Sequence, residues 1–73
     1  MRATKLVICI ENTDYPVSLE KRKIYELLPD RDAEKVGQVR IIDESGEDYL
    51  YPSSLFIEAK LPKAVQTAVI EAA

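Results

Sequence analysis

Four carboxylates in one short segment are the side chains best placed for chemistry. They are Asp43, Glu44, Glu47 and Asp48. Closely spaced carboxylates can hold calcium, but an EF-hand loop needs oxygen ligands at alternating positions and a closing glutamate. Tyr49 and Leu50 interrupt that pattern. Solvated turn carboxylates explain the segment without a site, so we expect no bound metal.

The chain lacks the residues that most enzymes use. It has no histidine, which removes the commonest general acid and base and the commonest transition-metal ligand. The serines have no base at a recognisable spacing, and Gly37 and Gly46, the only glycines, cannot form a phosphate-binding loop. We therefore expect a protein that is not an enzyme and carries no cofactor.

Length and cysteine content indicate one small domain in a reducing compartment. The chain has 73 residues, a length near the lower limit for a single hydrophobic core. Its net charge is −3. Its only cysteine, Cys9, lies in the apolar run Leu6–Ile10 and is expected to be a buried, inert thiol. That run is too short for a secretion signal or a membrane span. These features predict a cytoplasmic protein that does not bind membranes.

The basic residues form one cluster, Lys21 to Lys23, beside Tyr25. Nucleic-acid binding depends on neutralising several phosphates, and the acidic balance of the chain argues against it. A solvated strand edge protected by lysine and arginine is the favoured interpretation. A local RNA contact stays as the alternative, in which the protein is a small barrel associated with RNA or the ribosome.

Hydrophobic alternation predicts a sheet. The turn residues 43–46 join two strands into a hairpin, and Gly46 supplies the positive φ that such a loop needs. Asp30 or Asp32 can cap a helical turn over residues 31–36, with Gly37 at its exit. Strands are expected over Lys5–Glu11, Lys23–Leu28, Val39–Ile42 and Tyr49–Tyr51, with a further strand ending at Ile57.

The last part of the chain has helical spacing. Pro62 suits the first turn of a helix, and an apolar stripe follows it. A helix this short needs a docking surface to be ordered. It either covers an open end of the barrel or docks on another subunit, and we favour a two-fold homodimer. The stripe consists of Leu61, Val65, Ala68, Val69 and Ala72.

These elements predict a mainly β domain spanning residues 1–73. A five-stranded antiparallel barrel covers about residues 5–58, and a short helix covers about residues 61–72. Alternation does not decide whether Leu50 or Tyr51 points inward. The expected core consists of Leu6, Ile8, Ile10, Leu19, Ile24, Leu27, Val39, Ile41, Leu50 and Phe56.

Residues 12–57 resemble an SH3 domain. Tyr49–Phe56, reading Tyr-Leu-Tyr-Pro-Ser-Ser-Leu-Phe, is similar to the closing signature of that family, and Leu19–Leu28 resembles the entry from its first long loop into a strand. The pair Asp14-Tyr15 is similar to a motif near the start of SH3 domains. The chain also resembles a family of small bacterial proteins of no assigned activity that share the Asp43–Pro52 segment. Both resemblances imply a small SH3-like barrel.

The SH3 resemblance implies a partner-binding surface of altered composition. The chain has no tryptophan, Leu55 replaces the aromatic residue after the Pro-Ser signature, and only Tyr15 and Pro52 carry over from the peptide groove. We therefore predict a non-catalytic protein-interaction or accessory module rather than an ordinary polyproline binder. Nearby acids favour a basic partner: Asp14, Asp43, Glu44, Glu47 and Asp48. The candidate binding residues are Tyr15, Tyr49, Tyr51, Pro52 and Leu55.

Overall fold

A computed structural model describes residues 5–72, and within them the chain is mainly β. Five antiparallel strands form one sheet in the order β4-β3-β2-β1-β5. None of the helices in this range is long and apolar enough to cross a membrane. The strands are β1 (Lys5–Cys9), β2 (Ile24–Leu28), β3 (Gln38–Ile42), β4 (Asp48–Pro52) and β5 (Phe56–Glu58). The helical elements are α1 (Arg31–Lys35), the 3-10 turn η1 (Ser53–Leu55) and α2 (Lys63–Glu71).

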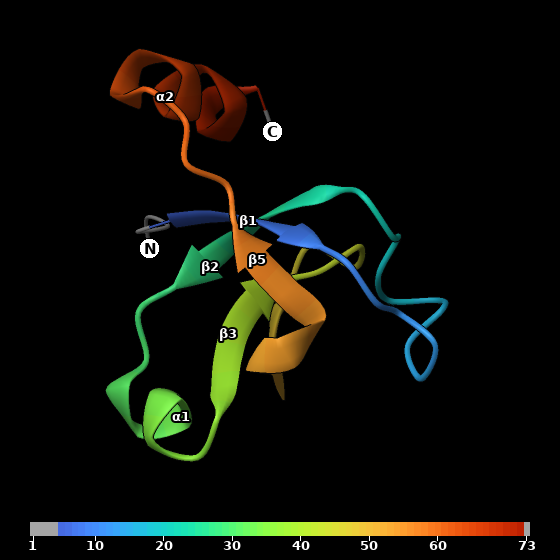
Figure 1. Cartoon of the computed structure of the whole chain (residues 1–73). Coiled ribbons are helices and arrows are strands. Elements are labelled where there is room, and N and C mark those ends of the chain that lie inside the picture. Colours follow the sequence, from blue (N-terminus) through green and yellow to red (C-terminus); the bar gives the residue numbers. More distant parts are fainter. Residues whose placement is uncertain (1–4, 73) are drawn as a thin grey trace.

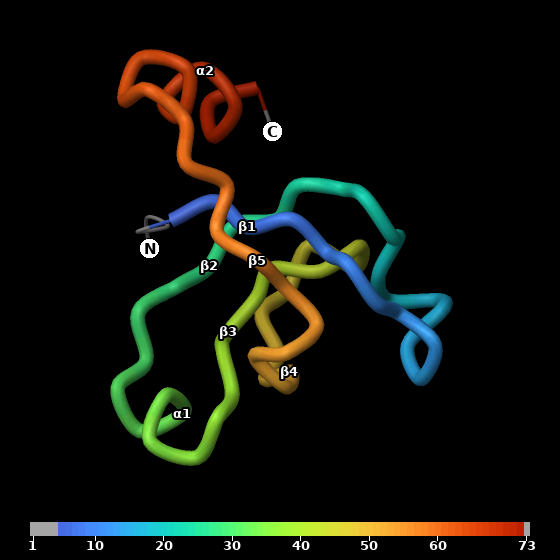
Figure 2. Tube along the Cα trace, in the orientation of Figure 1, coloured from blue at the N-terminus to red at the C-terminus, as the bar shows by residue number. Residues whose placement is uncertain are grey.

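The sheet curls into a half-barrel, with β4 and β5 at its two edges (Figure 1). This architecture is compatible with an SH3-like barrel and confirms the predicted fold class. The Cα trace shows β4 behind β3, and the long β1–β2 loop projecting on the far side of the sheet from α1 (Figure 2). The inside of the curl holds the core, and the outside carries α2 above β1.

The core is lined by alternate residues of each strand. Val7 lies opposite Tyr25, and Cys9 lies opposite Phe56. Cys9, Leu19 and Ile41 are completely buried. Leu6 faces the outside of the curl, but only 1 % of its surface is exposed. The hydrophobic cluster consists of Val7, Cys9, Leu19, Tyr25, Ile41, Tyr51 and Phe56.

The predicted core was right for Leu6, Leu19, Ile41 and Phe56 and wrong at three other positions. Ile10 lies just beyond the end of β1 and is exposed, and Ile24 and Leu50 are exposed because their strands present the neighbouring residues to the inside of the curl. In β4 it is Tyr51 that points inward. Ile8, Leu27 and Val39 are only partly buried.

The β1–β2 loop folds back to close the open side of the half-barrel. The Leu19 amide donates to the Tyr15 carbonyl at 3.0 Å, and the Asn12 side chain donates to the Leu19 carbonyl at 2.9 Å. These bonds place Leu19 in the core. Arg22 re-enters the sheet with a φ of 73° and donates its amide to the Cys9 carbonyl at 2.7 Å.

The helical turn α1 lies between β2 and β3 and is fixed at both ends. Asp30 is its N-cap, accepting from the Ala33 amide at 3.0 Å, and Gly37 leaves it with a φ of 74°, as predicted. The guanidinium of Arg40 in β3 donates to Asp30 at 2.9 Å and to Asp48 at 2.9 Å. Both the capping bond to Ala33 and Arg40 hold the pKa of Asp30 below its ordinary value. Arg40 therefore connects α1 to the edge strand β4.

The C-terminal helix α2 begins after Pro62, which is its N-cap residue rather than part of its first turn. No residue of α2 is buried, and Val65 is exposed. Val69 is half-buried and lines a groove together with Leu6. The predicted apolar stripe is therefore only partly covered by the rest of the chain.

Candidate functional site

A hollow beside β4 brings together three of the predicted binding residues. It measures about 420 Å³ and is called the Tyr hollow below. The ring of Tyr15, from the β1–β2 loop, meets that of Tyr51 edge-on, with centroids 4.9 Å apart and planes at 87°. Tyr49 stands beside them with half of its surface exposed (50 %). The lining residues are Tyr15, Ser18, Asp43, Ser45, Tyr49, Leu50 and Tyr51.

The floor of the Tyr hollow is fixed by a buried carboxylate. Asp43 is only 7 % exposed and accepts from the Tyr51 hydroxyl at 2.6 Å, from the Ser45 amide at 2.9 Å and from the Ser45 hydroxyl at 2.5 Å. Burial alone raises the pKa of Asp43, but the hydrogen bonds from Ser45 and Tyr51 outweigh it and hold the pKa below its ordinary value. Asp43 is therefore a charged anchor that aligns Tyr51.

Tyr51 has a supporting role rather than a surface role. Its side chain belongs to the hydrophobic cluster, and only its hydroxyl end reaches Asp43. Burial, together with the hydrogen bond to Asp43, raises the pKa of Tyr51 to about 12. The hydroxyl is therefore neutral and donates at neutral pH. Tyr15 and Tyr49 are the rings left for contact with a partner.

Pro52 and Leu55 do not line the Tyr hollow. Pro52 ends β4 and precedes η1, where its missing N–H suits the change from strand to turn. Leu55 is half-buried against the core, and its carbonyl accepts from the Ile10 amide at 2.8 Å. Both residues shape the corner that leads into β5.

The acidic residues around the Tyr hollow differ in what they already bind. Asp43 is committed to Tyr51 and Ser45, and Asp48 is paired with Arg40. Among residues 5–72, the side chains of Asp14 and Glu47 have neither an ion pair nor a hydrogen bond, and both are exposed. Asp14 directly precedes the lining residue Tyr15. Glu47 lies two residues from the lining residues Ser45 and Tyr49. Asp14 and Glu47 therefore place negative charge on the segments that border the Tyr hollow.

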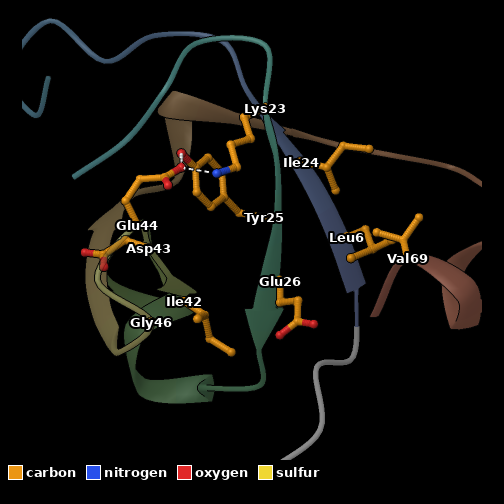
Figure 3. A pocket seen from close by; sticks show the side chains of 10 residues that line it. All are labelled: Leu6, Lys23, Ile24, Tyr25, Glu26, Ile42, Asp43, Glu44, Gly46 and Val69. Atoms are coloured by element: carbon orange, nitrogen blue, oxygen red, sulfur yellow. Dashed lines mark hydrogen bonds and ion pairs between the residues drawn. The ribbon is translucent and has the colours of Figure 1, made fainter. Parts of the chain in front are cut away.

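A second depression, called the outer groove below, lies on the convex face of the sheet and measures about 330 Å³ (Figure 3). Figure 3 shows Glu26 between Ile42 on one side and the pair Leu6 and Val69 on the other. Nothing in the sequence predicts this groove; its carboxylate on β2, Glu26, lies in an otherwise apolar strand. Its lining consists of Leu6, Lys23, Ile24, Tyr25, Glu26, Ile42, Asp43, Glu44, Gly46 and Val69.

One end of the outer groove is closed by a hydrogen-bonded network. The Glu44 carboxylate accepts from the Lys23 ammonium at 2.5 Å and from the Tyr25 hydroxyl at 2.5 Å (Figure 3). That hydroxyl in turn accepts from the Glu20 amide at 2.7 Å. Lys23 and Tyr25 hold the pKa of Glu44 below its ordinary value, and burial raises the pKa of Tyr25. This network ties β2 to the β3–β4 hairpin.

The basic cluster is largely engaged by carboxylates of the same chain. Lys21 lies 3.9 Å from Glu11, and Lys23 lies near both Glu20 and Glu44. Neutralisation within the chain leaves little positive charge for a phosphate backbone. This arrangement lends no weight to the RNA-binding alternative.

The Tyr hollow combines aromatic rings, carboxylates and turn serines. In the described part of the chain no three histidine, cysteine, aspartate or glutamate side chains group closely enough to hold a metal ion. The serines near the Tyr hollow serve the turn: Ser45 donates to Asp43, and the Ser18 carbonyl accepts from the Glu44 amide at 3.1 Å. What the Tyr hollow offers is aromatic surface beside negative charge, which attracts cations.

The chain was compared with protein-family models, with curated proteins and with solved structures, and none of them matches it. The fold is a five-stranded antiparallel half-barrel with a short C-terminal helix.

Proposed function

We propose that this protein is a non-catalytic interaction module that binds an extended, basic segment of a partner protein in the Tyr hollow. The observation that carries the proposal is the edge-on pair Tyr15 and Tyr51 beside the half-exposed ring of Tyr49. Rigid aromatic surface binds a peptide at a low cost in conformational entropy, because few rotatable bonds are lost. The likeness to SH3 domains supports the same interpretation.

Charge favours a basic segment. Asp14 and Glu47 are exposed and have no partner among the described residues, so their charges act on an approaching ligand. A lysine or arginine of the partner can contact the Tyr49 ring while its charge is balanced by these carboxylates. Such rim charges speed association, and salt weakens their effect.

A displayed library of random peptides tests the proposal. Selection on the wild-type protein is expected to enrich segments with lysine or arginine, and their affinity should fall as ionic strength rises. Tyr49→Ser should weaken binding by about tenfold or more, as expected for loss of a central aromatic contact. Tyr15→Ser should act in the same direction.

The matched control is Ile57→Ser. Ile57 is as exposed as Tyr49, 50 % in each case, but lies on the edge strand β5 and does not line the Tyr hollow. Its substitution should leave peptide affinity unchanged. Circular dichroism verifies that each variant is folded. Selected peptides that bind the folded Tyr49→Ser and Tyr15→Ser variants as tightly as wild type would contradict the proposed site.

We also propose that the protein associates with itself through α2. Val65 and Ala68 of the predicted stripe are exposed, and no residue of the helix is buried by its own chain. A second copy would cover this apolar surface by two-fold symmetry. Light scattering at high protein concentration should report a dimer, and Val65→Glu should shift it to a monomer. A monomeric wild-type protein would contradict the proposal.

A further inference from the structure

The outer groove contains a half-buried glutamate, Glu26, whose carboxylate has no partner among the described residues. Glu26 lies on the convex face of β2, and its register partners on the two sides are Leu6 in β1 and Ile42 in β3. Among residues 5–72, no hydrogen bond or ion pair engages its side chain. Since no buried side-chain oxygen of the described residues lacks a partner, the carboxylate of Glu26 stays accessible to solvent. It can therefore be reached by a ligand.

The other charged groups of the outer groove are already satisfied. Glu44 accepts from both Lys23 and Tyr25, and Asp43 belongs to the floor of the Tyr hollow. Within residues 5–72, the free charge of the groove is thus the single negative charge of Glu26, set among apolar walls. A complementary ligand carries one positive charge on an aliphatic stem.

We propose that the outer groove binds a lysine side chain of a partner protein, with its ammonium on Glu26 and its stem along Ile24, Ile42 and Val69. Lysine fits better than arginine, because one carboxylate between two apolar residues leaves most guanidinium donors unpaired. Ile24, Glu44 and Gly46 are exposed, so the groove opens to solvent and the chain that carries the lysine can pass outside it. This site is separate from the Tyr hollow.

A titration followed by amide chemical shifts tests the site. The probe is Nα-acetyl-lysine N-methylamide, and the uncharged norleucine analogue has the same stem without the ammonium. The lysine probe should shift the amides of Ile24, Glu26, Ile42 and Val69, whereas the norleucine probe should bind at least about tenfold more weakly. A third probe, n-pentylamine, separates a lysine side chain from a free alkylamine. Tighter binding of n-pentylamine than of the lysine probe would overturn the assignment to a partner's lysine.

Two isosteric variants isolate the charge. Glu26→Gln should weaken the lysine probe by about tenfold or more, since a charge-assisted hydrogen bond is lost. Glu34→Gln removes a carboxylate that is exposed and outside both the groove and the Tyr hollow, and it should leave the titration unchanged. Tyr49→Ser should also leave the shifts of the groove amides unchanged, because Tyr49 lines only the Tyr hollow, and this separates the site from the proposed function. Equal affinity of wild type and Glu26→Gln for the lysine probe would overturn the proposal.

Discussion

Replacing Phe56 by alanine is expected to destabilise the domain by about 3–5 kcal/mol. The side chain is 9 % exposed and meets two aromatic rings edge-on, Tyr25 at 6.4 Å and Tyr51 at 6.3 Å between centroids. Removing it leaves a cavity between both edges of the curled sheet. Small domains are stable by only about 5–15 kcal/mol, so the variant should lose a large fraction of its free energy of unfolding. Urea denaturation followed by circular dichroism measures the change.

The control for this experiment is the next residue in the chain. Ile57 belongs to the same strand but points outward, so Ile57→Ala should change the free energy of unfolding by less than about 1 kcal/mol. Equal effects of the two substitutions would mean that β5 does not contribute Phe56 to the core.

Replacing Asp43 by alanine should cost about 1.5–3 kcal/mol, because the buried Tyr51 hydroxyl loses its charged acceptor. The turn also loses the two bonds from Ser45. Tyr51→Phe removes only the hydroxyl and should cost less. The double variant should be more stable than the sum of the single effects predicts, since the two residues share one hydrogen bond. Strictly additive effects would contradict the coupling.

The same pair predicts how stability depends on pH. The pKa of Asp43 is lower in the folded state, so its contribution is complete above the unfolded value of about 4 and is lost as pH falls through the folded value. The pKa of Tyr51 is raised to about 12, so its contribution is lost as pH rises from the unfolded value of about 10 towards that value. When the urea midpoint of unfolding is measured as a function of pH, Asp43→Asn should reduce the fall of the midpoint at acid pH. If this fall at acid pH is the same in the variant as in the wild type, other carboxylates cause it.

The sequence predicted the elements better than the direction of their side chains. The hairpin, the cap at Asp30 and the positive φ at Gly37 and Gly46 depend on local chemistry and were confirmed. The prediction of which side chains of β1 point into the core was wrong. Leu6 and Val7 are both buried, so the alternation of apolar and polar residues does not show which of them points inward. For Tyr25 the deciding factor is the carboxylate of Glu44, from the distant β3–β4 hairpin, and for Tyr51 it is that of Asp43, at the start of its own hairpin turn. These carboxylates accept hydrogen bonds from the tyrosine hydroxyls, which allows each tyrosine to lie in the core.

The candidate sites show the same limit. The SH3 register correctly placed Tyr15 and Tyr49 in one hollow, but it included Pro52, which turns away into the corner before β5. The importance of Asp43 was hidden among the neighbouring turn acids. Glu26 gave no signal either, because a lone carboxylate in a strand is ordinarily a solvated one. Only the register with Leu6 and Ile42 gives it apolar neighbours.

Alkylation of the buried thiol of Cys9 measures how often the folded molecule opens. Cys9 is the only cysteine in the chain, it is 0 % exposed, and it lies at the end of β1, between β2 and the edge strand β5. An alkylating reagent can therefore react only with molecules in which the curl has opened. When closing is faster than alkylation, the labelling rate equals the intrinsic thiol rate multiplied by the opening equilibrium constant. Labelling in the absence of denaturant would thus report the free energy of opening and its increase when a ligand binds the closed form.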